Sequence, residues 1–248
     1  MSSGVEAIVF VANRELSDLG ITEKNIGTSW HVTNEFLSGL PASFGMSSVD
    51  FYAVLNQRNL SGLVGEVYKH ALGTEVSHLV PNPHPDGRPD LLDLRSEEAR
   101  AHFRNNCFDP VGGAPLREWL APFEFGGVEV KATIGDITGA SNFPIGTSRV
   151  EAVRGLNYWA HHRHACRLLG VYYDFCAATG GAPQVKALFL AEVQQDDWYR
   201  VSTGNPNKKK TSNTSLNASG RNAIKSGLVA TSGEKAYVVM LKRVGVAL

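Results

Sequence analysis

The sequence is poor in cysteine, and its three cysteines are far apart. Cys107, Cys166 and Cys176 form no CxxC pair, which argues against a zinc ribbon, and their odd number argues against a disulfide framework. No stretch approaches the roughly 18 apolar residues that a membrane-spanning helix needs. The apolar run 7–12 is short and follows an acidic residue, so it does not resemble a signal peptide. We therefore expect a cytoplasmic protein with no membrane partner.

The chain also lacks a net charge, because 24 basic side chains balance 24 acidic ones. The balance conceals a local asymmetry, since residues 198–233 contain six lysines and arginines and no aspartate or glutamate. A basic segment of this kind can bind a polyanion even in a neutral protein. Hydrophobic residues make up 43% of the chain and charged residues 19%, which is typical of a globular protein with an ordinary core.

Several common enzyme motifs are missing. The sequence has no GxGxxG, P-loop, GxSxG or HExxH motif, and each of these marks a well-defined class of cofactor-dependent or hydrolytic enzyme. No motif therefore supports the interpretation of this chain as a metabolic α/β enzyme.

Hydrophobic periodicity predicts alternating helices and strands. Residues 49–72 repeat apolar side chains at intervals of three and four, which predicts a helix with one buried stripe. Residues 125–135 alternate with a period of two, which predicts a strand. The predicted stripe consists of Leu60, Leu63, Val64, Val67 and Tyr68; further helices are expected at 96–106, 116–120 and 148–168, and further strands at 91–95, 170–177, 185–193 and 236–244.

These elements predict one α/β domain over residues 1–248, with a central mixed β-sheet flanked by helices. We place its catalytic core at about 60–193 and a basic, DNA-contacting segment at about 200–226. No internal repeat or linker divides the chain.

The strand at 125–135 carries an acid and a lysine two residues apart. Glu129 and Lys131 lie on the same face, because side chains of a strand alternate. Asp90 stands at the start of the preceding strand and could supply a second carboxylate to the same place. Hydrolysis of a phosphodiester needs a cation beside the phosphoryl oxygens and an aligned water. Two or three carboxylates can hold Mg²⁺, and a lysine can orient the water.

Pro89-Asp90 followed by Glu129-Val130-Lys131 resembles the signature of the PD-(D/E)XK nucleases, which include many type II restriction endonucleases. The resemblance covers about residues 60–193 and implies a restriction-endonuclease-like core, a Mg²⁺ cofactor and a catalytic set of Asp90, Glu129, Lys131 and Glu66. Glu66 matches the acidic residue of the family's first core helix, so the implied metal ligands are Asp90, Glu129 and Glu66. Glu129 follows Asp90 by 39 positions (129 − 90), a long gap for this family, and an inserted helix at 96–106 would explain it.

Each motif also has a simpler interpretation. A lone E-x-K is usually an exposed face of a strand, and Pro-Asp is a common turn dipeptide. Asp86 and Asp93 compete with Asp90, but Asp86 lies in a proline-rich loop, and Asp93 would lie on the opposite face of its strand. His161 and His164 have the spacing of a helical metal pair, yet no third ligand accompanies them, and histidines on a helix are usually polar-face or packing residues. Proximity to a DNA backbone is the better functional alternative to a metal site.

Two polar segments could contact DNA. The glycine-rich loop 135–149 and the basic segment 208–221 offer hydroxyl, amide and cationic groups, which bind phosphates and base edges. A flexible, solvated loop is the alternative for the lysine run. The predicted DNA-binding residues are Ser141, Asn142, Arg149, Lys208, Lys209, Lys210 and Arg221.

The sequence therefore predicts a Mg²⁺-dependent, sequence-specific endonuclease that cleaves double-stranded DNA, similar to a type II restriction enzyme. One active site cuts one strand, so a homodimer is the expected working form. A repair or structure-specific nuclease with the same centre is the first alternative. A DNA-binding module that does not cleave is the second, although a binder gains little from carboxylates near phosphate.

Overall fold

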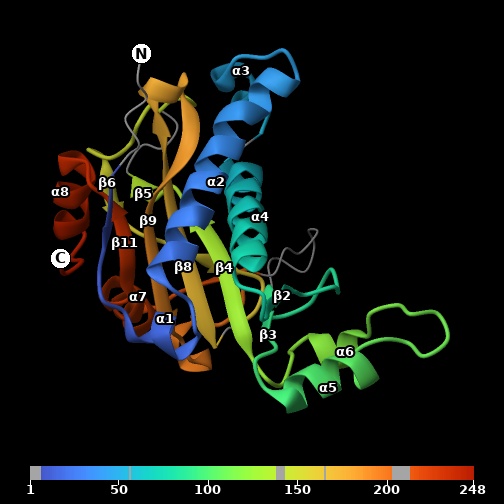
Figure 1. Cartoon of the computed structure of the whole chain (residues 1–248). Helices are drawn as coiled ribbons and strands as arrows, with labels where there is room; N and C mark the ends of the chain where they lie inside the picture. Colours follow the sequence, from blue (N-terminus) through green and yellow to red (C-terminus); the bar gives the residue numbers. More distant parts are fainter. Residues whose placement is uncertain (1–6, 56, 138–142, 165, 203–212) are drawn as a thin grey trace.

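A central sheet of seven strands organises the protein (Figure 1). The computed structural model describes residues 7–248 except 56, 138–142, 165 and 203–212. The strand order is β1-β11-β9-β8-β4-β3-β2; only β4 and β8 run parallel, and the other neighbours are antiparallel. The strands are β1 (Ile8–Phe10), β2 (Leu79–Pro81), β3 (Leu91–Asp93), β4 (Gly127–Thr133), β8 (Arg167–Cys176), β9 (Ala182–Glu192) and β11 (Leu228–Ser232). The predicted mixed sheet is thus confirmed.

Helices cover both faces of this sheet. In Figure 1, α2 and α4 cross one face side by side, while α7 and α8 lie on the other side of the molecule. The helices are α1 (Arg14–Asp18), α2 (Glu23–Ser43), α3 (Ser48–Val54), α4 (Gln57–Glu75), α5 (Glu97–Asn106), α6 (Arg117–Leu120), α7 (Ala218–Ser226) and α8 (Lys235–Arg243), with 3₁₀ turns η2 (Ala177–Thr179) and η3 (Gln195–Asp197). No helix in the described part of the chain is long and apolar enough to cross a membrane.

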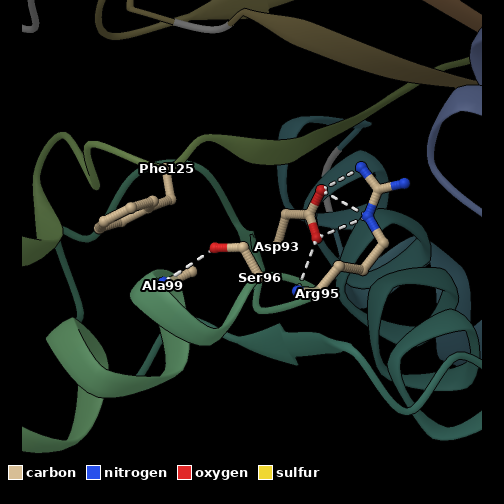
Figure 2. Close-up of a pocket in the computed structure, with 5 residues that line it drawn as sticks. All are labelled: Asp93, Arg95, Ser96, Ala99 and Phe125. Carbon is tan, nitrogen blue, oxygen red and sulfur yellow. Dashed lines mark hydrogen bonds and ion pairs between the residues drawn. The ribbon is translucent and has the colours of Figure 1, made fainter.

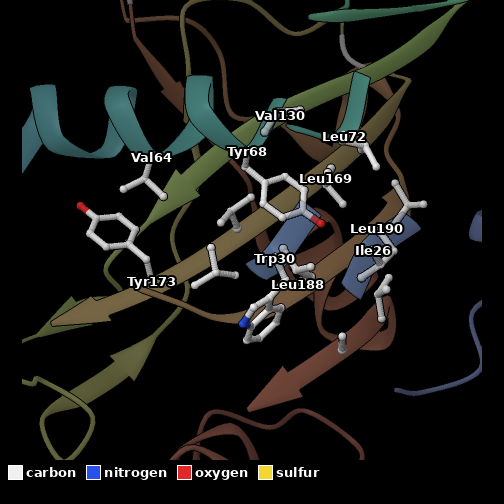
Figure 3. Close-up of a cluster of buried hydrophobic side chains, with 14 of the residues drawn as sticks. Ile26, Trp30, Val64, Tyr68, Leu72, Val130, Leu169, Tyr173, Leu188 and Leu190 are labelled. Atoms are coloured by element: carbon white, nitrogen blue, oxygen red, sulfur yellow. The ribbon is translucent and has the colours of Figure 1, made fainter. Parts of the chain in front are cut away.

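The main core lies between α2, α4 and the sheet (Figure 3). Leu60, Val64, Tyr68 and Leu72 of α4 are fully buried, with Leu63 and Val67 partly buried beside them. The predicted stripe is therefore the face that α4 turns toward β4 and β8. The stripe fixes the rotation of α4, so the next face of the helix, which carries Glu66 and Lys69, lies beside the edge of β4.

An insertion separates β3 from β4. Helices α5 and α6 pack on a small core of their own and extend away from the sheet in Figure 1. Ser96 caps α5 by accepting a hydrogen bond from the backbone N–H of Ala99 at 3.0 Å, as the predicted helix start requires. The long gap between Asp90 and Glu129 is therefore an insertion, and β3 and β4 still pair as antiparallel neighbours.

The predicted helix at 148–168 is wrong. This segment contains two short strands, β6 (Val153–Gly155) and β7 (Trp159–Ala160), and β8 begins at Arg167. Its buried residues Leu156, Tyr158 and Ala160 follow a period of two, whereas Trp159 is 56% exposed. Strand β6 pairs with β5 (Asp136–Ile137), and β7 pairs with β10 (Thr214–Ser215). Tertiary pairing thus selects one of two periodicities that the segment contains.

The predicted strand at 236–244 is also wrong, because this segment forms α8. Tyr237, Met240, Leu241 and Val244 are buried at helical spacing against the second face of the sheet. The last strand is instead β11, which the sequence did not reveal and which fills the position between β1 and β9. All five residues of β11 are buried.

Candidate active site

Two carboxylates meet where β3 begins beside β4. Leu91 pairs with Val128 in antiparallel register, so the position before β3 places Asp90 opposite Glu129. The side chain of Asp90 also binds the backbone of β4: its Oδ2 accepts a hydrogen bond of 2.8 Å from the backbone N–H of Val130. The two acidic residues therefore share one face of the sheet although 39 positions separate them.

Lys131 lies between the two carboxylates. Its Nζ is 2.8 Å from Glu129 Oε1 and 3.3 Å from Asp90 Oδ2. The side chain of Glu129 is only 2% exposed, whereas those of Asp90 and Lys131 are 21% and 24% exposed. Glu129 is thus the buried member of the cluster, whereas the side chains of Asp90 and Lys131 reach solvent. The three residues predicted from the E-x-K and Pro-Asp motifs converge at one point.

His162 is a fourth member of the cluster that sequence reasoning did not select. Its Nε2 lies 3.0 Å from Glu129 Oε1. The prediction paired His161 with His164 on a helix, but the extended segment after β7 brings the histidine between them to Glu129. No sequence signal distinguished His162 within the run His-His-Arg-His, because its contact depends on how the segment passes β4.

The charges of the cluster depend on one another. Burial alone would raise the pKa of Glu129, but Lys131 and His162 outweigh it and lower the pKa to about 2. Burial opposes the charged form of Lys131 too, yet the two carboxylates raise the pKa of its ammonium above the ordinary value. Burial raises the pKa of Asp90, which Lys131 opposes and Glu129 reinforces. Glu129 and Lys131 are therefore ionised at neutral pH, and an added cation would favour the ionised form of Asp90.

The cluster opens into a cavity of about 850 Å³ between α4, the outer edge of β4 and the segment 159–162. Asp90 and Lys131 line this cavity, as do Glu66 and Lys69 of α4. Glu66 is 65% exposed and forms an ion pair of 2.5 Å with Lys69. The structure thus places Glu66 on the wall of the same cavity, as a partner of Lys69 and outside the Asp90–Glu129–Lys131 cluster.

The donor atoms of this cluster fit a small, hard cation in part. Glu129 Oε2 is buried and has no hydrogen-bond partner among the described residues, so a cation at this oxygen would satisfy it. Asp90 supplies a second carboxylate across the strand pair. No group of three or more His, Cys, Asp or Glu side chains in the described part of the chain has the arrangement of a metal site. Two carboxylates with water would therefore have to hold the ion.

Comparison with known proteins assigns this chain to no family. No protein-family model matches it, and neither a curated protein nor a solved structure is significantly similar to it. The geometry of the cluster and the residues that surround it therefore carry the functional inference.

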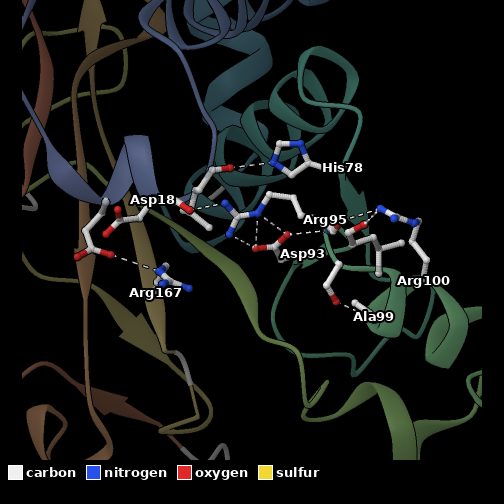
Figure 4. Close-up of polar contacts among 11 residues, drawn as sticks. Asp18, His78, Asp93, Arg95, Ala99, Arg100 and Arg167 are labelled. Carbon is white, nitrogen blue, oxygen red and sulfur yellow. Dashed lines mark hydrogen bonds and ion pairs between the residues drawn. The ribbon is translucent and has the colours of Figure 1, made fainter.

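Asp93, a competitor of Asp90, has a different role. It faces Arg95 (Figure 2), whose Nε and Nη2 donate to its carboxylate at 2.6 to 3.0 Å. Arg95 also donates to the backbone carbonyl of Asp18, and Arg100 donates to the carbonyls of Leu94 and Arg95 (Figure 4). This network joins the end of β3 to α1 and α5, so Asp93 is structural.

Arg149, a predicted DNA-binding residue, is buried and only 1% exposed, so this structure gives its side chain no surface for DNA. Its Nη2 donates to the carbonyl of Phe143 at 3.2 Å, and the guanidinium lies over the ring of Phe175. Arg221 lies on α7, outside the cavity wall, and donates to the carbonyl of Leu216. The other predicted DNA-binding residues lie outside the described residues: Ser141, Asn142, Lys208, Lys209 and Lys210.

Proposed function

We propose that this protein is a Mg²⁺-dependent endonuclease that hydrolyses phosphodiester bonds of double-stranded DNA. The observation that carries the proposal is that Lys131 Nζ lies within 3.3 Å of both the Asp90 and the Glu129 carboxylates, with Asp90 and Lys131 on the wall of an open cavity. A buried carboxylate, a second carboxylate and a protonated lysine form an acid-rich, hydrogen-bonding centre. The E-x-K and Pro-Asp motifs supply the same three residues, and their resemblance to the PD-(D/E)XK nucleases favours phosphodiester hydrolysis.

The side chains have distinct tasks in this proposal. Lys131 stays protonated, so it donates hydrogen bonds to a phosphoryl oxygen or to the attacking water, and does not act as a base. Asp90 and Glu129 would hold Mg²⁺, which neutralises charge on the phosphate and activates water when it is bound. His162 positions Glu129 through the 3.0 Å contact with Oε1, while Oε2 has no hydrogen-bond partner among the described residues and would be left for the cation.

A type II-like enzyme that cuts at specific sequences as a homodimer is the form of this function that we favour. Two symmetric copies would place one centre on each strand of a palindromic site. The basic stretch 198–233 would supply positive charge for the phosphates. A structure-specific or repair nuclease would use the same centre on another form of DNA, and a non-cleaving binder would use only the basic stretch.

The test is cleavage of plasmid and phage DNA with and without Mg²⁺. We expect wild-type protein to give discrete bands, and Asp90→Ala or Glu129→Ala to abolish cleavage while DNA binding persists. Asp86→Asn is the matched control, because Asp86 is an exposed carboxylate a few residues before Asp90. A smear would indicate a nonspecific nuclease. Intact DNA with bound protein would refute the nuclease and support the binding module.

Lys131 provides a second test of the centre. Lys131→Ala should lower turnover by orders of magnitude, and Lys131→Arg should not restore it, because a planar guanidinium cannot occupy the position of the ammonium between two carboxylates. The measurement is single-turnover cleavage of a duplex oligonucleotide, with circular dichroism to verify folding. If a folded Lys131→Ala variant kept full activity, Lys131 would have no catalytic role, and the E-x-K spacing would reflect only the alternation of side chains along a strand.

A further inference from the structure

A small second sheet carries two exposed aromatic side chains on one face. The sheet consists of β7 and β10, with Ser215 of β10 paired to Trp159 of β7, and an isolated bridge adds the segment 198–199. On the other side of β10, the backbone N–H of Tyr199 donates to the carbonyl of Ser215 at 3.0 Å, and Trp198 pairs with Leu216. Directly paired residues point to the same face of a sheet, so Trp159, Ser215 and Tyr199 form one row.

The opposite face of this small sheet is buried. Ala160, Trp198, Thr214 and Leu216 are each at most 4% exposed. Trp159 and Tyr199 are 56% and 52% exposed in the row that faces outward. Neighbouring strands are spaced by about 4.8 Å, so the backbones that carry the two rings lie about 10 Å apart. The row therefore exposes two separate aromatic rings to solvent.

This row is continuous with the candidate active site. Trp159 lines the cavity that contains Asp90 and Lys131, and Asn213, which precedes β10, lines it as well. Tyr199 extends the row away from the cavity. Arg200 follows Tyr199 and is exposed, and residues 198–233 contain no acidic side chain. An occupant of the row should therefore be planar, apolar on its faces and negatively charged elsewhere.

We propose that Trp159 and Tyr199 stack on unpaired bases of a DNA strand whose backbone continues to the Asp90–Glu129–Lys131 centre. Every base presents an aromatic face, whatever the sequence, and the exposed Arg200 next to Tyr199 can pair with a phosphate of the same strand. Within a duplex the base faces are covered by neighbouring bases, so the row would engage bases that leave the stack beside the cleaved bond. This inference rests on the proposed nuclease function and adds a substrate class, namely DNA with unpaired nucleotides next to the scissile phosphate.

The experiment measures DNA affinity without cleavage, by fluorescence anisotropy in EDTA. The probes are a single-stranded oligo(dT), a duplex with a single-stranded tail and a blunt duplex of equal length. We expect Trp159→Ala and Tyr199→Ala each to weaken binding of oligo(dT) and of the tailed duplex by about tenfold. Trp159→Phe should retain most of the affinity. Trp119→Ala is the matched control, because Trp119 is 42% exposed on α6, outside the row.

The outcomes separate the two proposals. If the Ala variants bind oligo(dT) as wild type does, the stacking row is refuted, whether or not the protein cleaves DNA. If they lose oligo(dT) affinity but the wild type cleaves nothing in Mg²⁺, the row is supported and the nuclease is refuted. If the Ala variants lost as much affinity for the blunt duplex as for oligo(dT), the row would not be a site for unpaired bases. A change from dimer to monomer in sedimentation, with DNA affinity intact, would overturn it in favour of a contact between copies.

Discussion

The Glu129–Lys131–His162 contacts predict how the stability of this protein depends on pH. Glu129 is 2% exposed, and its carboxylate faces Lys131 Nζ at 2.8 Å and His162 Nε2 at 3.0 Å. The substitution Glu129→Gln keeps the size of the side chain and removes its charge. It leaves Lys131 with Asp90 as its remaining acidic partner, at 3.3 Å. The variant should therefore lose the stabilisation that the ionised carboxylate provides.

The magnitude follows from the pKa of Glu129. Folding lowers this pKa from an ordinary value of 4.5 to about 2. That difference of about 2.5 corresponds to about 3 kcal/mol of stability. Because the pKa of the folded state is depressed, this contribution is present above pH 4.5 and is lost as the pH falls through about 2. Removal of the Glu129 charge also relieves repulsion on Asp90, so about 3 kcal/mol is an upper figure.

Urea denaturation followed by tryptophan fluorescence would measure this difference at several pH values. We expect wild type to exceed Glu129→Gln in free energy of unfolding by up to about 3 kcal/mol at pH 7, and by roughly half of that difference or less at pH 3. Glu97→Gln is the matched control: Glu97 pairs with Arg100 and Arg104 but is exposed, so its replacement should leave stability almost unchanged. A difference that stays constant from pH 7 to pH 3 would refute the ion-pair argument.

Four further predictions concern the core, the cluster and the basic segment. Leu169→Ala should lower the free energy of unfolding by about 2–5 kcal/mol, because Leu169 is fully buried in the main core; urea denaturation measures it. Arg149→Ala should cost about 1–3 kcal/mol in the same assay and leave the DNA affinity of the folded protein unchanged, whereas a selective loss of affinity would contradict its burial. His162→Ala should lower the cleavage rate about 10- to 100-fold with little loss of folding, since it positions Glu129; an unchanged rate would exclude this role. Replacement of the lysines at 208–210 by Ala should flatten the slope of log affinity against log salt by up to about 3, and an unchanged slope would leave them as a solvated loop.

The sequence alone specified the features that depend on strand alternation, helical spacing and helix capping. Strand alternation places Glu129 and Lys131 on one face wherever β4 lies, and the start of β3 places Asp90 at its neighbour. The α4 stripe and the Ser96 cap of α5 follow in the same way from spacing and from hydrogen-bonding chemistry. The alternation, the stripe and the cap each depend on residues within a few positions of one another, so the sequence pattern predicts them, whereas the approach of Asp90 to Glu129 requires the pairing of β3 with β4.

Tertiary contacts decided the rest. Residues 148–168 contain both a helical and an alternating apolar pattern, and pairing of β6 and β7 with distant strands selects the extended form. That choice brings His162 to Glu129 and Trp159 to the cavity wall. It also accompanies the burial of Arg149, which in the sequence looks like an exposed cation of a polar loop. Burial and long-range pairing depend on the whole packed chain, so a linear pattern cannot specify which side of the sheet such a residue will face.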